Sequence, residues 1–167
     1  VSSTFKDEVE IIKHNIKEKK IDIANLDVFS SPLTRCRKLA DEIFSNFKLD
    51  DRLKELHFGD WEMKSLLQIP KTEITEWERN LMTFQIPNGE TNKEFFNRLS
   101  FFCDEIVSRG KNVFIVAHAG SINCILSYLT DIPFDKTVKE NWKRISHGSL
   151  SCLIKKEKKF YVKYCGV

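Results

Sequence analysis

The chain has 167 residues, 41% of them hydrophobic, and carries 27 Lys and Arg against 24 Asp and Glu, for a net charge of +3. That length suits one domain with one sizeable core, and the small charge excess argues against nucleic acid as a partner. No apolar run approaches the roughly 20 residues that a membrane span needs, so we expect no membrane partner either.

The first part of the chain predicts a helix, a strand and a second helix, followed by a loop. Residues 6–19 place apolar side chains on one helical stripe. Residues 26–30 form a short β-type run that ends at a Ser-Pro pair, and residues 34–47 again show apolar side chains at helical spacing. Residues 50–62 have no periodic pattern and are expected to form a loop.

The middle of the chain predicts two more helices, a turn and a buried strand. Residues 72–82 are helical in pattern, and residues 86–89 (Ile-Pro-Asn-Gly) read as a turn. A long amphipathic helix is expected over residues 91–108. Residues 112–117 are continuously apolar, as in a parallel strand buried on both faces, and an apolar helix follows over residues 122–130.

Alternating apolar residues predict a terminal antiparallel hairpin over residues 150–164, with the basic run 155–159 at its solvated turn. Strands that alternate with helices indicate an α/β fold: a three-layer sandwich with a mostly parallel central sheet, helices on both faces and this C-terminal hairpin. The two parallel-type strands visible here are too few to cover the apolar faces of at least four helices. We therefore expect a further central strand that is missing from this sequence.

Two polar residues lie in the segments that follow the predicted parallel strands. Arg35 lies in the first turn of a predicted helix, where free backbone N–H groups and the helix dipole favour an anion. His118 follows the buried strand, and ligands of open α/β sheets bind outside the carboxyl ends of strands. The alternative readings are an exposed surface Arg35 and a structural, hydrogen-bonded His118.

Glu55 lies in a loop that is rich in both acidic and aromatic residues. A carboxyl group beside apolar rings loses hydration in its charged form, which favours the protonated form that can donate a proton. A solvated loop carboxylate is the alternative reading of Glu55.

The five cysteines show no CxxC spacing, so neither a disulfide framework nor a zinc site is indicated, and a reducing cytoplasm is the expected compartment. Cys103 and Arg109 match the Cys-x5-Arg spacing of tyrosine phosphatases. That chemistry needs a loop of free backbone N–H groups, whereas these residues lie in a predicted helix without Gly. Cys103 is therefore expected to be a core residue.

Four segments, in this order, resemble the histidine phosphatase superfamily, which includes phosphoglycerate mutases. They read Ser-Ser-Pro-Leu-Thr-Arg at 30–35, Leu-Lys-Glu-Leu-His-Phe-Gly-Asp-Trp-Glu at 53–62, Pro-Asn-Gly-Glu-Thr at 87–91 and Val-Ala-His-Ala-Gly at 116–120. The sequence departs from the family pattern in lacking the opening Arg-His-Gly or Arg-His-Thr motif, which carries the nucleophilic His. We expect that motif, and the missing strand, in an upstream segment of the real molecule.

The resemblance implies phosphomonoester hydrolysis through a phosphohistidine intermediate, without a metal or cofactor. It assigns phosphate binding to Arg35 and His118, and catalytic roles to His118 and Glu55, with Glu55 as proton donor to the leaving group. It also implies that residues 1–167 form a single histidine-phosphatase-like domain whose partner is a small phosphorylated metabolite.

Within the superfamily the bacterial α-ribazole phosphatases look most similar, which implies α-ribazole 5′-phosphate, an intermediate of cobalamin biosynthesis, as substrate. The alternatives are a phosphatase or mutase for another small phosphometabolite, or a catalytically inactive phosphate-binding module if the chain truly starts at Val1. The short region between Gly59 and Gly89 disfavours a mutase, because mutases usually carry longer insertions there.

Overall fold

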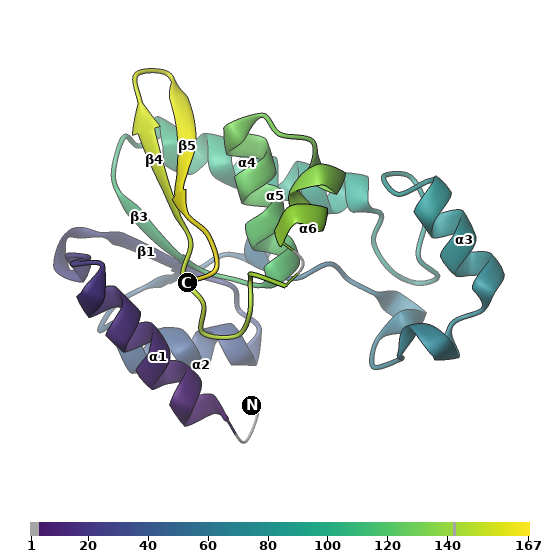
Figure 1. Cartoon of the computed structure of the whole chain (residues 1–167), viewed down its shortest axis with the longest axis horizontal. Coiled ribbons are helices and arrows are strands. Elements are labelled where there is room, and N and C mark those ends of the chain that lie inside the picture. Colours follow the sequence, from purple (N-terminus) through teal and green to yellow (C-terminus); the bar gives the residue numbers. More distant parts are fainter. Residues whose placement is uncertain (1–3, 142) are drawn as a thin grey trace.

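Helices and strands alternate along most of the chain in the computed structural model, which describes residues 4–141 and 143–167 (Figure 1). Val1 lies outside the described residues. The helices are α1 (Phe5–Glu18), α2 (Thr34–Ile43), α3 (Lys71–Arg79), α4 (Asn92–Ser108), α5 (Ala119–Thr130) and α6 (Phe134–Asn141). The strands are β1 (Asp27–Ser30), β2 (Lys48–Leu49), β3 (Val113–Val116), β4 (Cys152–Lys156) and β5 (Lys159–Tyr164).

The central sheet has three parallel strands in the order β2-β1-β3, and β4 and β5 form a separate antiparallel hairpin. In the pairing of β1 with β3, Ser30 lies opposite Val116, so both strands end at the same edge. The Ser31 N–H donates to the Val116 carbonyl at 2.9 Å and extends this pairing by one residue. The predicted parallel sheet and C-terminal hairpin are confirmed.

Alternate residues of β1 and β3 point to opposite faces of the sheet, as the period of a strand requires. Phe29 and Ile115 pack into a cluster with residues of α4 and α5. Val28 and Phe114 pack on the other side against α2, and Phe114 also meets the α1 side chain Ile12. Figure 1 shows the resulting layers, with α1 and α2 below the sheet and α4 and α5 above it, which confirms the predicted sandwich.

The predicted helix over residues 34–47 is too long, because α2 ends at Ile43 and the two-residue strand β2 follows. Phe44 has extended backbone angles (φ −120°, ψ 134°), yet its ring is buried against Phe114 at 4.8 Å between centroids. Because Phe44 is buried and lies at helical spacing from the apolar residues of α2, the sequence pattern resembled one more helical turn. Helix α5 begins at Ala119, three residues before the prediction, and α6 was not predicted.

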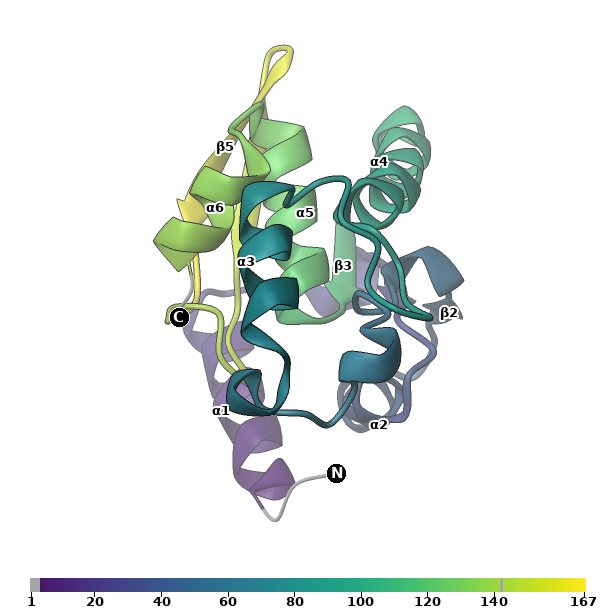
Figure 2. The same ribbon diagram turned by 90° about the vertical axis from the view of Figure 1, so that its right-hand side faces the viewer.

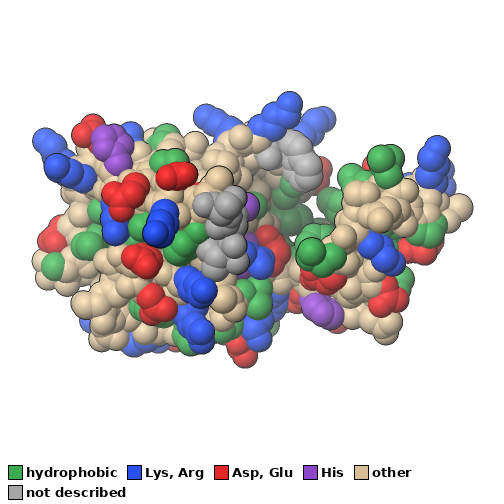
Figure 3. Space-filling model, turned by 90° about the horizontal axis from the view of Figure 1, so that it is seen from below, with side chains coloured by type: hydrophobic (Ala, Val, Ile, Leu, Met, Phe, Trp, Pro, Cys, Tyr) green, Lys and Arg blue, Asp and Glu red, His purple; other side chains and the backbone are tan. Residues whose placement is uncertain are grey.

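Residues 59–90 leave the body of the molecule as an arm that carries α3 (Figure 1). Within it, the Trp61 ring contacts Trp77 and Phe84 with centroid distances of 6.1 and 5.6 Å. At its base a Cβ on Gly59 would lie 2.1 Å from the Pro87 carbonyl oxygen, so the two chain segments approach as closely as glycine permits. Seen from below, a groove bordered by hydrophobic side chains separates the arm from the rest (Figure 3).

Cys103 lies inside α4, is fully buried and has a pKa raised to about 12 by that burial, which confirms it as a core residue. In the described part of the chain, no helix is both long and apolar enough to cross a membrane.

Candidate active site

Arg35 and His118 meet at the edge where β1 and β3 end. Arg35 lies in the first turn of α2, and His118 is the residue directly before α5. Because the strands pair in parallel and in register, the two segments that follow them are neighbours, and Arg35 Nε donates to His118 Nδ1 at 2.9 Å. His118 is only 6% exposed, whereas Arg35 is an exposed residue. The structure therefore brings together the two residues singled out at the strand ends.

The second ring nitrogen of His118 contacts Ser31, which sequence reasoning did not single out. Nε2 lies 2.8 Å from the Ser31 hydroxyl oxygen. Since the guanidinium of Arg35 can only donate to Nδ1, the ring proton belongs on Nε2, which then donates to Ser31. The signals in the sequence were the position of Ser31 directly after a predicted strand and within the family-like segment 30–35.

The imidazole of His118 is neutral in this environment. Burial lowers its pKa to about 3, and the positive charges of Arg35 and Arg98 add to that effect. The Cys36 thiol packs 3.5 Å from Nε2 and donates to the Ala117 carbonyl at 3.4 Å. Burial raises the pKa of Cys36 to about 12, so this thiol stays protonated and is part of the packing around the ring.

Glu55 reaches the start of α5 from the loop that follows the 3-10 turn Asp51–Leu53. Its carboxyl oxygens accept from the backbone N–H groups of Leu56 at 3.0 Å and Gly120 at 3.1 Å. A Cβ on Gly120 would lie 2.2 Å from Glu55 Oε1, so the absence of a side chain there makes room for the carboxyl group.

Burial raises the pKa of Glu55, although both backbone N–H groups and the charges of Arg35 and Arg98 work in the opposite direction. The net effect favours the protonated acid, as expected of a carboxyl group in an apolar loop. The charge of Arg35 acts on the Glu55 carboxyl group because both residues lie at this site. Arg35, Glu55 and His118 thus converge from three segments that are far apart in the sequence.

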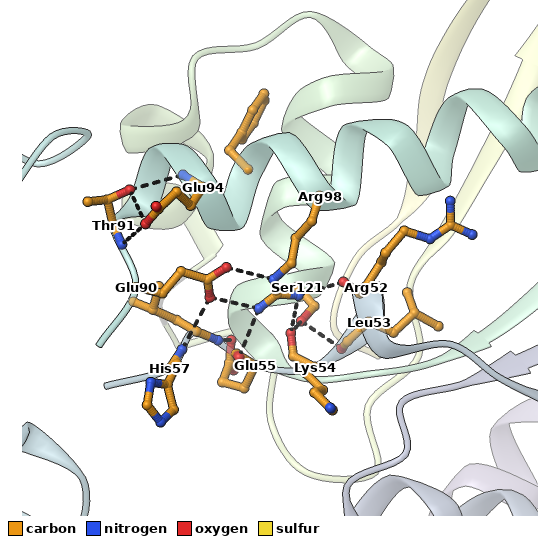
Figure 4. A network of polar contacts seen from close by, with 12 residues as sticks. Arg52, Leu53, Lys54, Glu55, His57, Glu90, Thr91, Glu94, Arg98 and Ser121 are labelled. Carbon is orange, nitrogen blue, oxygen red and sulfur yellow. Dashed lines mark hydrogen bonds and ion pairs between the residues drawn. The ribbon is translucent and has the colours of Figure 1, made fainter. Parts of the chain in front are cut away.

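Arg98 of α4 also reaches this region, where its guanidinium donates to the Glu55 carbonyl at 3.0 Å (Figure 4). Sequence reasoning missed Arg98, although a signal existed. It lies between Phe95 and Phe102 at helical spacing, on the inward face of the amphipathic helix, where a charged residue needs a partner.

The remaining histidines lie elsewhere. His14 belongs to α1, His147 approaches Glu8 at 3.5 Å, and His57 is an exposed loop residue. Within residues 4–141 and 143–167, none of the three makes a hydrogen bond to Arg35 or His118, and no group of three or more His, Cys, Asp or Glu could hold a metal ion.

Known proteins resemble this chain both in sequence and in fold. Residues 7–166 match the sequence profile of the Histidine phosphatase superfamily (branch 1). "Putative phosphoserine phosphatase 2" of Hydrogenobacter thermophilus is 31% identical over 133 residues, which cover 75% of this chain and 64% of that protein. The 2,3-bisphosphoglycerate-dependent phosphoglycerate mutase of Methanosarcina mazei is 26% identical over 84% of this chain and 58% of its own length.

The solved structure of the α-ribazole phosphatase from Shigella flexneri superposes with a TM-score of 0.78 at 22% identity, covering 96% of this chain and 81% of that one. At that identity the likeness is one of fold. The chain spans less than two thirds of the length of either curated relative. With a profile that matches nearly its whole length, a relative at 31% identity and the same fold, the chain belongs to the histidine phosphatase superfamily, branch 1.

Proposed function

We propose that this chain forms most of the active site of a phosphomonoester hydrolase that works through a phosphohistidine intermediate. The observation that carries the proposal is the contact of Arg35 with His118 at the paired ends of β1 and β3, with the Glu55 carboxyl at the start of the same helix, α5. An exposed guanidinium and a helix N-terminus bind phosphoryl oxygens well, and in this proposal the His118 Nε2–H turns from Ser31 to the phosphoryl group.

The nucleophile in this proposal is a histidine on a strand outside the residues described here, seated on the free edge of β3. Among the described residues β3 pairs only with β1, and β4 only with β5. Figure 2 shows the hairpin and β2 on opposite sides of β3. A parallel strand between β3 and β4 would join the two sheets and would end beside His118, where the family carries its Arg-His motif.

In the first step the nucleophilic nitrogen attacks phosphorus and forms an N–P bond while the ester P–O bond breaks. Glu55 donates its proton to the departing alkoxide and becomes a carboxylate. In the second step water attacks phosphorus, Glu55 takes back a proton, and the N–P bond breaks to release inorganic phosphate. Arg35 and His118 hold the phosphoryl oxygens through both steps and stabilise their developing charge.

α-Ribazole 5′-phosphate is the proposed substrate, on the strength of the sequence resemblance to α-ribazole phosphatases. Phosphoserine is a second candidate, because the relative at 31% identity is named as a phosphoserine phosphatase. Comparison of kcat/KM for α-ribazole 5′-phosphate, phosphoserine and 3-phosphoglycerate decides among them. Formation of 2-phosphoglycerate from the last compound would instead favour a mutase.

Glu55→Gln tests the acid role in the complete protein. We expect kcat/KM for an alkyl phosphate to fall about 10²–10⁴-fold, the range for loss of a general acid. The fall should be much smaller for p-nitrophenyl phosphate, because nitrophenolate leaves without a proton. The matched control is Glu62→Gln. The Glu62 carboxyl group also accepts from a backbone N–H, that of Phe58, in the neighbouring segment.

Equal losses on both substrates would remove Glu55 from the acid role.

The phosphohistidine intermediate is tested in the same protein by acid-labile, base-stable ³²P labelling during turnover. Absence of both label and turnover in the complete protein would contradict the hydrolase and leave a phosphate-binding module.

A further inference from the structure

Arg98 binds the backbone of the Glu55 loop through three carbonyl groups. Its Nη1 donates to the carbonyls of Arg52 at 2.6 Å and Lys54 at 2.8 Å, and its Nη2 donates to the carbonyl of Glu55 at 3.0 Å (Figure 4). The Arg98 side chain is only 22% exposed. A largely buried guanidinium that donates three hydrogen bonds to one short backbone segment stabilises the conformation of that segment.

Glu90 fixes Arg98 in this orientation. Its two carboxylate oxygens accept from Arg98 Nε at 2.7 Å and Nη2 at 2.9 Å, a bidentate pair with defined geometry. Glu90 also binds the far end of the same loop: its carboxylate accepts from the His57 N–H at 3.3 Å, and its own N–H donates to the His57 carbonyl at 2.9 Å. The Arg98–Glu90 ion pair therefore binds the loop backbone on both sides of Glu55.

Helix α5 holds the loop from the opposite side. The Ser121 hydroxyl lies 3.1 Å from the Leu53 carbonyl and 3.0 Å from the Lys54 carbonyl, and can donate to either. The neighbouring Gly120 N–H donates to an oxygen of the Glu55 carboxyl group. The location of the acidic group relative to His118 thus depends on how α4 and α5 together hold residues 52–57.

We propose that Arg98, held by Glu90, is a positioning residue that places the Glu55 carboxyl group at the leaving-group oxygen. The inference rests on the proposed function, in which Glu55 is the acid. A displacement of about 1 Å of a catalytic group can cost about 10²-fold in rate, so a clamp on the backbone of the acid acts on catalysis without touching substrate. Lysine carries the same charge but lacks the planar fork that serves a carboxylate and three carbonyls at once.

Arg98→Lys in the complete protein is the test. We expect kcat/KM for an alkyl phosphate to fall at least tenfold more than kcat/KM for p-nitrophenyl phosphate, since only the alkyl leaving group needs the proton of Glu55. The control is Arg109→Lys at the other end of α4, where Arg109 pairs with Glu105, and its substrate ratio should not change. If Arg98→Lys does not fold, Glu90→Gln provides the same readout, because it frees Arg98 with little change in shape.

A double-mutant cycle with Glu55→Gln separates this inference from the proposed function. Arg98→Lys should change the substrate ratio little further once Glu55 is gone, because both changes act on one proton transfer. Equal losses on the two substrates in Arg98→Lys, or a full further loss in the Glu55→Gln background, would overturn the positioning role while Glu55 remains the acid. If Glu55→Gln itself shows no leaving-group dependence, the acid role of Glu55 in the proposed function fails and the positioning role of Arg98 falls with it.

Discussion

The ring of His118 is held through both nitrogens, by Arg35 on one side and Ser31 on the other. This arrangement keeps the imidazole neutral, aligned and almost fully buried, with its pKa lowered to about 3 chiefly by burial. In the unfolded chain the same residue titrates with a pKa near 6.5. Between these values the unfolded state binds a proton that the folded state excludes, so His118 makes the fold less stable as the pH decreases from about 6.5 towards 3.

Replacement of His118 by Gln therefore changes how stability depends on pH. We expect the wild-type free energy of unfolding to decrease relative to His118→Gln by about 1.4 kcal/mol per pH unit below pH 6, and the difference to be constant above pH 7.5. The raised pKa of Glu55 acts in the opposite direction, but Glu55 is present in both proteins and its effect largely cancels. Urea titrations at pH 4, 5, 6, 7 and 8 measure the difference, and parallel curves would show that His118 is not held neutral.

At the level of elements, the start of α5 combines two functions in three residues. His118 precedes the helix, and Gly120 in its first turn offers an N–H to Glu55 and leaves space for the carboxyl group. A side chain at position 120 would meet the flexible end of Glu55 first, with backbone atoms of the body not among its nearest contacts. A side chain at position 120 should therefore disturb the geometry of the active site more than the stability of the fold.

Gly120→Ala should separate the two. In a helix Ala is more favourable than Gly by about 0.8–1.0 kcal/mol, so we expect a melting temperature equal to or above that of the wild type. The added methyl displaces the Glu55 carboxyl, and turnover of alkyl phosphates should fall at least tenfold more than turnover of p-nitrophenyl phosphate. Ala119→Gly is the control, because it changes the adjacent helical position without adding atoms near Glu55. An unchanged substrate ratio in Gly120→Ala would contradict the tight fit.

At the level of the whole molecule, the described residues form two separate sheets with α4 and α5 on one face of the larger sheet and α1 and α2 on the other. The apolar side chains of β3 at positions 113–115 are only half-buried, although this strand has the most continuous apolar pattern of the chain. A continuously apolar strand suits a position with neighbours on both edges. These features support the proposal of a further strand beside β3.

Hydrogen exchange in the complete protein tests that arrangement. Successive N–H groups of a strand point to opposite edges, so a strand with one neighbour protects only alternate amides. We expect all four amides of β3 to be protected from exchange, measured residue by residue by NMR. Protection restricted to the amides that face β1 would show that no strand occupies the other edge of β3.

The sequence by itself determined the elements whose signal is local. Apolar residues at helical spacing identified α1 and α4, the continuous apolar run identified β3, and alternation identified the terminal hairpin. The short segments around Arg35, Glu55 and His118 pointed to the site because each residue type follows a strand or lies in an unusual loop. Parallel pairing of β1 and β3 then brings two of these segments together as a direct consequence of the fold class.

The tertiary structure alone decided the features that depend on distant neighbours. β2 is a two-residue strand whose existence depends on pairing with β1, and α2 ends at Ile43, after which Phe44 packs from an extended backbone. The contacts of Ser31 with His118, and of Arg98 with the Glu55 loop, join segments 87 and 43–46 residues apart. A buried hydrogen-bonding group must find a partner, but which one it finds is set by the packing of whole helices and not by the residues beside it in the chain.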